Sequence, residues 1–393
     1  MKKLLVCILT LALTLSLLTA CGGAQSKPSE SVPSEAVEPT SGEAEQTTKT
    51  TFGLEPFAER QTLRIGAIAG SQTAMPFIVA MGEGFFDELN IEVEMSTFTA
   101  GPAMMEANAD WDIAAAGVAG NLVGAIGYDL PAVGVCDRET NQVLFVRKDS
   151  KIAKDPTNPE LYKGTTWLLP LGTTAHYTLI KQLESLGLSM DEIKTVNMDV
   201  SSAYTAFNGG EGDGMVLFNT NVFIAEDAGY VRIADSGSLN ATNSAFLTMT
   251  PDAIENERDL MITTWALFYL TADWINESEE HKSIASNYYL EHCEEEGIAC
   301  TELTAMRTLN IWKCPSLSDS IATMTNEVDD DKGLFTERKL LQAESEMLKT
   351  MDFFVEQEKY KAEDRVYLLE NKLVDNSITK DAVVMLDKLG ITH

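Results

Sequence analysis

Residues 63–98 read LRIGAIAGSQTAMPFIVAMGEGFFDELNIEVEMSTF. The pattern of apolar residues predicts a strand over 63–69, a helix over 76–89 and a second strand over 91–98. Pro76 stands at the first turn of this helix, where proline is tolerated. A strand, a helix and a strand in this order form a βαβ unit, so we expect a largely parallel sheet that helices cover on both faces.

The same alternation continues along the chain in two blocks. The first block adds predicted helices at 102–108 and 121–127 and predicted strands at 111–116 and 131–135. The second block has predicted strands at 143–146, 165–169, 195–198, 214–218 and 231–233 and predicted helices at 175–186, 203–207 and 222–227. Two similar blocks predict an α/β protein with two lobes.

After a returning strand at 244–249, the pattern becomes mostly helical. Apolar residues recur every three or four positions over 262–275, 281–293, 301–311 and 336–360. We expect this helical part to pack on the first lobe, so that the chain crosses between the lobes twice, near 135–142 and near 235–244. The predicted lobes are then residues 61–140 together with 236–393, and residues 141–235.

The amino-terminal end has the pattern of an export signal. Lys2 and Lys3 precede an apolar run at 4–18, which is too short for a comfortable membrane span. The next residues complete the tetrad Leu18-Thr19-Ala20-Cys21, which resembles the lipobox of bacterial lipoproteins. We therefore expect a signal peptide at 1–20 and an acylated Cys21 that anchors the chain to a membrane. The alternative is an ordinary signal peptide with a chance cysteine.

The segment that follows is poor in apolar residues. Residues 21–60 are mostly Ser, Pro, Glu, Thr and Gly, with almost no large apolar side chain before Phe52. Such a segment buries too little surface to offset its conformational entropy, so we expect a disordered tether. The remaining chain, about 330 residues, is long enough for two domains.

Charge and cysteine content exclude several classes of partner and cofactor. The formal net charge is −31, which disfavours nucleic acid and anionic lipid surfaces as partners. Cys7 belongs to the signal and Cys21 to the anchor, which leaves Cys136, Cys293, Cys300 and Cys314. A disulfide among the last three fits an exported protein, and the sequence leaves its connectivity open. No Cys-x-x-Cys pair occurs, so we expect neither a metal nor another cofactor.

Four loops combine small residues with hydroxyl or amide side chains just before a predicted helix. In open α/β sheets such loops lie at the carboxyl ends of strands, where ligands bind. The candidate ligand-binding residues are Ser71, Gln72 and Thr73; Ala119, Gly120 and Asn121; Thr173, Thr174, Ala175 and His176; and Phe218, Asn219 and Asn221. In each loop the polar side chains could instead cap an ordinary helix. His176 could bind an anion or its own backbone, and Phe218 could stack on a ligand or end a buried strand.

Three passages resemble the substrate-binding proteins of ABC importers for aliphatic sulfonates, taurine and nitrate, the NMT1/THI5-like family. They are GEGFFDELNIEV at 82–93, WDIAAAG at 111–117, and GTTAHY at 172–177 followed by LESLGL at 183–188. The wider family includes binders of thiamine-pyrimidine precursors.

The resemblance implies a type II periplasmic-binding-protein fold with two hinged lobes and two crossings. Its members close on one small polar or anionic solute, such as a sulfonate or nitrate, and deliver it to a permease with an ATPase below. By position, 71–73, 119–121 and 173–176 fall on ligand-contacting loops. The expected protein is a monomer without catalytic activity, anchored at the extracytoplasmic face of a membrane.

One passage departs from the family's pattern. Many members have Trp-Glu-Pro or Trp-Asp-Pro where this chain has Phe218-Asn219-Thr220-Asn221. This passage forms the second lobe's wall of the ligand site, so a different sequence there favours a different solute. Two alternatives stay open. One is an enzyme on the same fold, related to thiamine-pyrimidine synthesis, although the cysteine cluster of those synthases is missing. The other is a sensory or adhesion lipoprotein that binds a protein.

Overall fold

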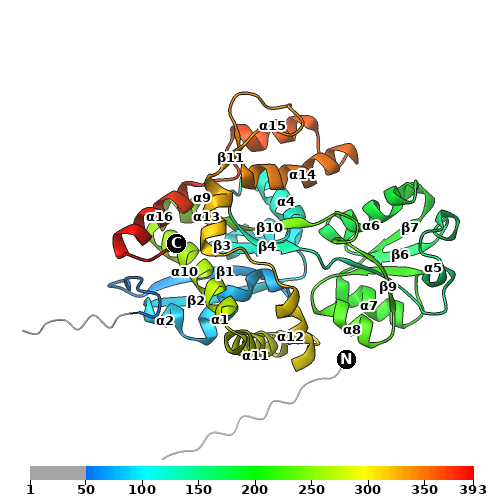
Figure 1. Ribbon diagram of the computed structural model, residues 1–393, viewed down its shortest axis with the longest axis horizontal. Coiled ribbons are helices and arrows are strands. Elements are labelled where there is room, and N and C mark those ends of the chain that lie inside the picture. Colours follow the sequence, from blue (N-terminus) through cyan, green and yellow to red (C-terminus); the bar gives the residue numbers. More distant parts are fainter. Residues whose placement is uncertain (1–49) are drawn as a thin grey trace, which may run out of the picture. The chain divides into compact units, whose positions relative to one another are not determined.

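The computed structural model describes residues 50–393, which contain two five-stranded sheets (Figure 1). The predicted signal peptide at 1–20, the predicted lipid site Cys21 and most of the predicted tether lie outside the described residues. The last part of that tether prediction is wrong, because residues 50–60 pack on the first lobe. The Phe52 ring meets the Phe85 ring edge-on at 4.8 Å, and Leu54 is buried. These apolar side chains are sufficient to hold the segment in place.

The first lobe has the strand order β2-β1-β3-β10-β4. Its strands are β1 (Gln61–Ile68), β2 (Ile91–Phe98), β3 (Ile113–Ala116), β4 (Ala132–Glu139) and β10 (Asn243–Met249). Strand β1 pairs in parallel with β2 and β3, whereas β10 is antiparallel to both β3 and β4.

The second lobe repeats this plan with the order β7-β6-β8-β5-β9. Its strands are β5 (Val143–Val146), β6 (Thr166–Leu169), β7 (Lys194–Asn197), β8 (Gly214–Leu217) and β9 (Val231–Asp235). Strand β6 is parallel to β7 and β8, and β5 is antiparallel to β8 and β9.

Both sheets are mixed, because one strand in each runs against the other four, and the prediction of largely parallel sheets is confirmed for those four strands. The antiparallel strands β5 and β10 are the ones that the chain enters directly from the other lobe, through residues 140–142 and 236–242, without a helix between. The α/β class, the two crossings and the helical carboxyl-terminal part are confirmed.

The helices of the two α/β blocks are mostly close to their predicted positions. They are α1 (Met75–Gly82), α2 (Phe85–Glu88), α3 (Gly101–Glu106), α4 (Val118–Tyr128), α5 (Lys151–Lys154), α6 (Thr174–Ser185), α7 (Val200–Asn208) and α8 (Thr220–Asp227). The single helix predicted over 76–89 is two helices, because Gly84 has φ of 77° and breaks the helical path.

The carboxyl-terminal part contains more elements than predicted. They are α9 (Pro251–Asn256), α10 (Arg258–Glu277), α11 (Glu279–Glu295), α12 (Glu302–Ile311), α13 (Leu317–Thr325), β11 (Glu327–Val328), β12 (Leu340–Leu341), α14 (Gln342–Glu356), α15 (Ala362–Glu370) and α16 (Ser377–Leu389). The helix predicted over 336–360 is shorter at both ends, since residues 340–341 pair with β11.

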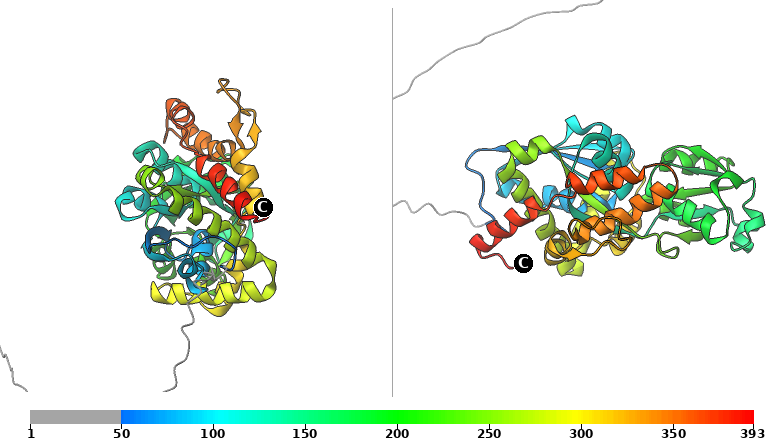
Figure 2. Two further views of the ribbon diagram at one scale, coloured as in Figure 1. Left: turned by 90° about the vertical axis from the view of Figure 1, so that its left-hand side faces the viewer. Right: turned by 90° about the horizontal axis from the view of Figure 1, so that it is seen from above.

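Helix α10 attaches this part to the first sheet. The Trp265 indole donates to the Val133 carbonyl at 2.9 Å, and the Tyr269 hydroxyl donates to the Val135 carbonyl at 2.9 Å. Gly134 lies between these two acceptors, and a Cβ there would lie 2.3 Å from the Tyr269 hydroxyl. Figure 2 shows the helices that follow, in yellow to red, on the side of the first lobe.

Two further features of residues 50–393 bear on earlier expectations. Their four cysteines are free thiols, so the disulfide considered for Cys293, Cys300 and Cys314 is not formed in this structure. Within the same residues, no helix has both the length and the apolar character of a membrane span.

Candidate functional site

A pocket lies between the two lobes at the carboxyl ends of their strands. Its cavity volume is about 30 Å³, far below the roughly 300–1,000 Å³ of ligand pockets, so the lobes are nearly closed on it in this structure. The first lobe lines it with Ile68, Ser71, Gly101, Pro102, Gly117, Ala119, Gly120 and Glu139, and the second lobe with Thr173, Thr174, Phe218 and Asn219. Elements from both lobes therefore meet at one cavity.

Three helices of eight or more residues begin at this pocket. Gly117, Thr173 and Asn219 are the residues that directly precede α4, α6 and α8. The first backbone N–H groups of a helix have no partner within it, and they carry the positive end of its dipole. The pocket thus offers oriented donors from both lobes to a ligand with acceptor atoms.

Two glycines let the starts of α3 and α4 approach closely. A Cβ on Gly120 would lie 2.8 Å from the Gly101 Cα, and a Cβ on Gly101 would lie 3.1 Å from the Gly120 Cα. Both contacts are to backbone, which cannot move aside as a flexible side chain does. The shape of this pocket wall therefore depends on glycine at both positions.

The lobes touch each other at the rim of the pocket. The Asn219 side-chain amide donates to the Ala69 carbonyl at 3.3 Å. Asn219 has φ of 57° and ψ of −152°, a backbone conformation that non-glycine residues rarely adopt. A Cβ on neighbouring Gly70 would lie 3.5 Å from the Thr220 hydroxyl, so the backbone of one lobe approaches the helix start of the other.

The pocket contains one ionisable side chain, Glu139, at the end of β4. The residue is 8% exposed, and its Oε2 atom has no hydrogen-bond partner among the described residues. A Cβ on Gly117 would lie 3.0 Å from this atom, so glycine at 117 leaves space for the carboxyl group. Burial, together with the charge of Asp137, raises the pKa of Glu139 to about 8, although Gln142 partly opposes the shift.

Asp137 lies behind the pocket and is fully engaged by the protein. Its carboxyl group accepts from the Gln72 side-chain amide at 3.0 Å and from the Lys313 backbone N–H at 2.9 Å. Burial raises the pKa of Asp137 to about 6, and these two donors limit the shift. The two acids at the end of β4 therefore differ. Asp137 has its hydrogen-bond donors within the protein, whereas Glu139 lines the cavity with one oxygen unpaired among the described residues.

The structure brings seven of the candidate ligand-binding residues to the pocket. They are Ser71, Ala119, Gly120, Thr173, Thr174, Phe218 and Asn219. Each of the four predicted loops therefore contributes at least one residue. Their contact with a ligand remains a prediction.

The other six candidates do not line the pocket. Gln72 binds Asp137, as described above. The Thr73 hydroxyl donates to the Ala115 carbonyl at 3.3 Å, and the Asn121 amide donates to the Phe246 carbonyl at 3.1 Å. These three side chains connect a loop to the sheet behind it.

The remaining three lie in the second lobe. Ala175 is in the core, and the Asn221 amide is 3.5 Å from the Ser201 hydroxyl. His176 Nδ1 accepts the Gly172 N–H at 3.3 Å, which is the local backbone role considered for it. Burial and the charge of Lys359 lower the pKa of His176 to about 4, so its imidazole is neutral near pH 7.

Five residues of the lining were not among the predicted ligand-binding residues: Ile68, Gly101, Pro102, Gly117 and Glu139. The Gly101-Pro102 pair starts a helix after strand β2, at the same sheet edge as the chosen loops, so its position could have been inferred. The position of Glu139 in the lining was harder to infer, because this residue follows Asp137 and Arg138 beyond the end of the predicted strand.

Two contacts outside the pocket also join the lobes on the side of α6. The Tyr177 ring meets the Phe353 ring edge-on at 4.3 Å. The Lys359 ammonium group donates to the Gly172 carbonyl at 3.1 Å. Both partners from the first lobe lie on or just after α14, so the carboxyl-terminal helices support the second lobe directly.

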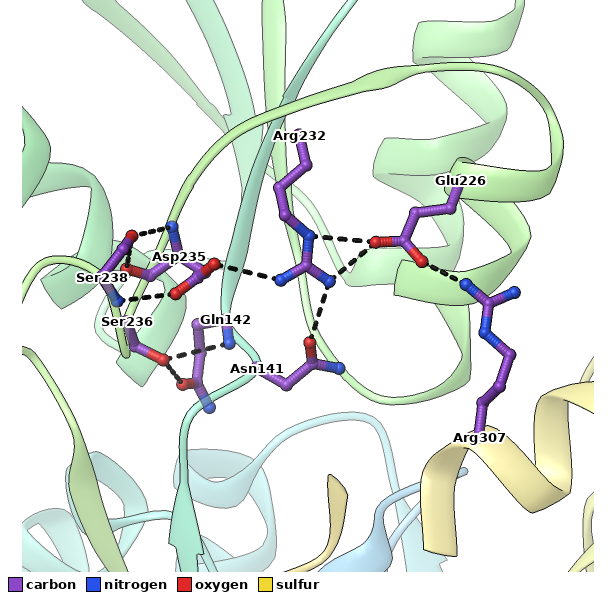
Figure 3. A network of polar contacts seen from close by, with 8 residues as sticks. All are labelled: Asn141, Gln142, Glu226, Arg232, Asp235, Ser236, Ser238 and Arg307. Carbon is purple, nitrogen blue, oxygen red and sulfur yellow. Dashed lines mark hydrogen bonds and ion pairs between the residues drawn. The ribbon is translucent and has the colours of Figure 1, made fainter. Parts of the chain in front are cut away.

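An ionic network joins the lobes on the side of α8 (Figure 3). Arg307 on α12 pairs with Glu226 and Asp227 on α8, and its guanidinium lies 4.4 Å from the Phe223 ring centre. Glu226 also pairs with Arg232 at 2.7 Å. Arg232 in turn contacts Asn141, which lies in the first crossing, at 3.3 Å. Through Arg232 and Glu226, the network connects the first crossing at Asn141 to the contact that Arg307 makes between the lobes.

A second and larger cavity, of about 270 Å³, lies between α6 and α14, and several of its charged groups pair with one another. Arg365 pairs with Asp330 at 2.6 Å and with Asp352 at 2.8 Å, and all three line the cavity. Within residues 50–393, no group of three or more His, Cys, Asp and Glu side chains could hold a metal ion. The interlobe pocket is the stronger candidate site, because helix starts from both lobes and residues of all four predicted loops meet there.

Comparison with known proteins places this geometry in context. A model of the NMT1-like family matches residues 57–288, more than half of the chain. A curated protein of Escherichia coli (strain K12), named for binding aliphatic sulfonates, is 28% identical over 242 residues, which are 60% of this chain and 73% of that protein.

Solved structures share the fold at low sequence identity. The periplasmic aliphatic sulphonate binding protein SsuA from Escherichia coli has a TM-score of 0.59 and 18% identity, covering 78% of this chain and 98% of that one. The periplasmic nitrate-binding protein NrtA from Synechocystis PCC 6803 has a TM-score of 0.62 and 11% identity, covering 84% and 89%. The desulfurization enzyme DSZB also shares the fold, with a TM-score of 0.54, 12% identity and coverage of 84% and 99%.

Proposed function

The chain belongs to the NMT1-like family, and from this membership we propose that it is the solute-binding protein of an ABC importer. It binds one small molecule in the interlobe pocket and delivers it to a membrane permease that an ATPase drives. The observation that carries the proposal is the pocket itself, which helix starts from both lobes surround. The named relatives that bind sulfonates and nitrate support the same role.

The site suits reversible capture. The protein encloses a guest by closing two lobes around it, and the two crossings at 140–142 and 236–242 are the covalent links about which the lobes can move. Contacts such as Asn219 to Ala69 form only when the lobes meet, so they favour the closed state that holds the solute.

A melting experiment tests binding. A solute at about a hundred times its dissociation constant stabilises the native state by roughly 2.7 kcal/mol, which raises the melting temperature measurably. Sulfonates, nitrate, amino acids, pyrimidines and peptides form a suitable panel, together with any molecule that native mass spectrometry finds bound to the purified protein. Absence of both a retained molecule and a stabilising one would argue against the proposal.

The membrane anchor is a second part of the proposal. An acylated Cys21 would hold the protein at the extracytoplasmic face, where a monomer can reach the permease. The mass of the mature amino-terminal peptide reports acylation directly. Replacement Cys21→Ser is expected to release the protein from the membrane fraction, and an unchanged distribution would contradict the anchor.

An enzyme is the other candidate, because a desulfurization enzyme shares the fold. Nucleophilic chemistry needs an activating base beside the nucleophile. Among the residues that the structure describes, no histidine or cysteine lines the pocket, and Ser71 bonds to Thr73 at 3.0 Å instead. Product formation from a bound solute, followed by mass spectrometry, would favour the enzyme.

A further inference from the structure

The pocket combines two opposite kinds of recognition group. Three helix starts supply donors, whereas Glu139 supplies a carboxyl group at the pocket wall whose buried Oε2 atom has no partner among the described residues. In the described part of the chain, the ion pairs include none with Glu139. A solute that carries only a sulfonate or nitrate group would satisfy the helix starts and could accept from the protonated carboxyl group, but it would leave the ionised form of Glu139 without a partner.

The protein does not provide a cation for Glu139 from its neighbours. Arg138, next to it on β4, pairs with Glu346 at 3.3 Å. Lys313 donates through its backbone to Asp137, and its charge acts on that acid. The acid nearest to Glu139 on the same strand, Asp137, repels a second negative charge. A buried carboxylate without a partner is costly, so Glu139 is mostly protonated near pH 7 in the empty pocket, and a positive or N–H-bearing partner from outside is what would stabilise its charged form.

We propose that the solute carries an N–H donor, an ammonium or an amino group, which binds Glu139, together with an acceptor group that binds the helix starts. This inference rests on the proposed function and narrows its substrate class to amphoteric molecules. Gly117 takes part as a positioning residue, because the absence of its side chain leaves the carboxyl group room to face the cavity. A charge-assisted hydrogen bond of this kind is about twice as strong as a neutral one.

Pairs of probe molecules that differ only by an amino group measure the contribution of the N–H donor to binding. The pairs are 2-aminoethanesulfonate with ethanesulfonate, β-alanine with propionate, and 4-aminopyrimidine with pyrimidine. Calorimetric titration is performed with the full mature chain, its Glu139→Gln variant and a Glu255→Gln control. Glu255 is exposed on α9 of the same lobe and does not line the pocket.

The expected result is tighter binding of the amino member of a pair, or retention of an N–H-bearing molecule in native mass spectrometry. Glu139→Gln should weaken that binding at least tenfold, while Glu255→Gln leaves it unchanged. Binding of the amino member should also strengthen between pH 6 and pH 8, because the carboxyl group must lose its proton to pair with a cation.

Three results would overturn the inference and leave the proposed function in place. They are equal binding of both members of a pair, retention of a solute without N–H groups, and an affinity that Glu139→Gln does not change. Melting curves of the variant guard against a folding defect, and Gly117→Ala gives a second perturbation of the same carboxyl group. A protein that neither retains nor binds any small molecule contradicts the proposed function and this inference together.

Discussion

The Asn219 side chain of the second lobe donates to the Ala69 carbonyl of the first lobe at 3.3 Å, directly at the pocket rim. Asn219 also precedes α8, whose start faces the cavity. One residue therefore shapes the pocket and joins the lobes that enclose it. Its unusual backbone conformation is held in place by both roles.

Replacement of Asn219 by alanine should weaken solute binding without unfolding the protein. The interlobe hydrogen bond contributes about 1 kcal/mol, so the dissociation constant is expected to rise roughly fivefold, mostly through faster release. Stopped-flow dissociation measures this change. Asn221→Ala is the matched control, since Asn221 lies two positions further on and outside the lining. An equal effect in both variants would contradict the role of the Asn219 bridge.

Alanine at Gly120 should destabilise the first lobe. The new Cβ would meet the Gly101 backbone at 2.8 Å, and overpacking of this kind costs about 1–3 kcal/mol. Chemical denaturation measures the free energy of unfolding. Gly127→Ala on the same helix has open space around it and should instead stabilise by up to about 1 kcal/mol. Similar changes in both variants would mean that the close approach does not matter.

Glu139 should make the ligand-free protein less stable at high pH. Its folded-state pKa of about 8 exceeds the usual 4.5, so the native state holds a proton that the unfolded chain releases. This contribution is fully present below pH 4.5 and is lost as the pH rises through 8. The pKa of Asp137 is also raised, to about 6, so its contribution to stability is likewise lost as the pH rises, but at lower pH values.

The difference between wild type and Glu139→Gln isolates this group. The melting temperature of the wild type minus that of Glu139→Gln should become smaller as the pH rises from 5 to 9. His176 acts in the opposite direction, since its lowered pKa removes stability as the pH falls below 6.5, but it cancels in the difference. A constant difference across this range would show that Glu139 keeps an ordinary pKa.

Replacement of Lys359 by methionine should raise the pKa of His176. Burial is the larger cause of the lowered pKa and remains, while the charge of Lys359 is the second cause and is removed. Proton NMR of the imidazole across pH 3 to 8 measures the shift. The same variant loses the bond to the Gly172 carbonyl, so amide exchange at the start of α6 should become faster. An unchanged His176 titration would place Lys359 further from the ring in solution.

The strand and helix order near the pocket was predictable from local patterns. Apolar strands followed by Gly, Ser, Thr or Asn identified the starts of α4, α6 and α8, because the carboxyl ends of neighbouring strands meet at one sheet edge. Side-chain direction within each loop was not predictable. Asn121 turns toward β10, a strand that lies more than a hundred residues later in the chain.

Glu139 illustrates the same limit of local patterns. The predicted strand ended at 135, and residues 135–142 were expected to form the first crossing between the lobes. In the structure β4 continues to Glu139, where pairing with Asn243 on β10 extends the sheet toward the second lobe. The burial of these polar residues depends on a long-range strand, and the adjacent sequence carries no information about it.

The position of β10 also has a consequence for the order of folding. The second lobe consists of contiguous residues, so its sheet can form as soon as β9 is available. The first lobe must wait for β10, which separates β3 from β4 and lies beyond the entire second lobe in the chain. Because long sequence separation slows the formation of contacts, the second lobe is expected to mature first, with the first lobe completed around it.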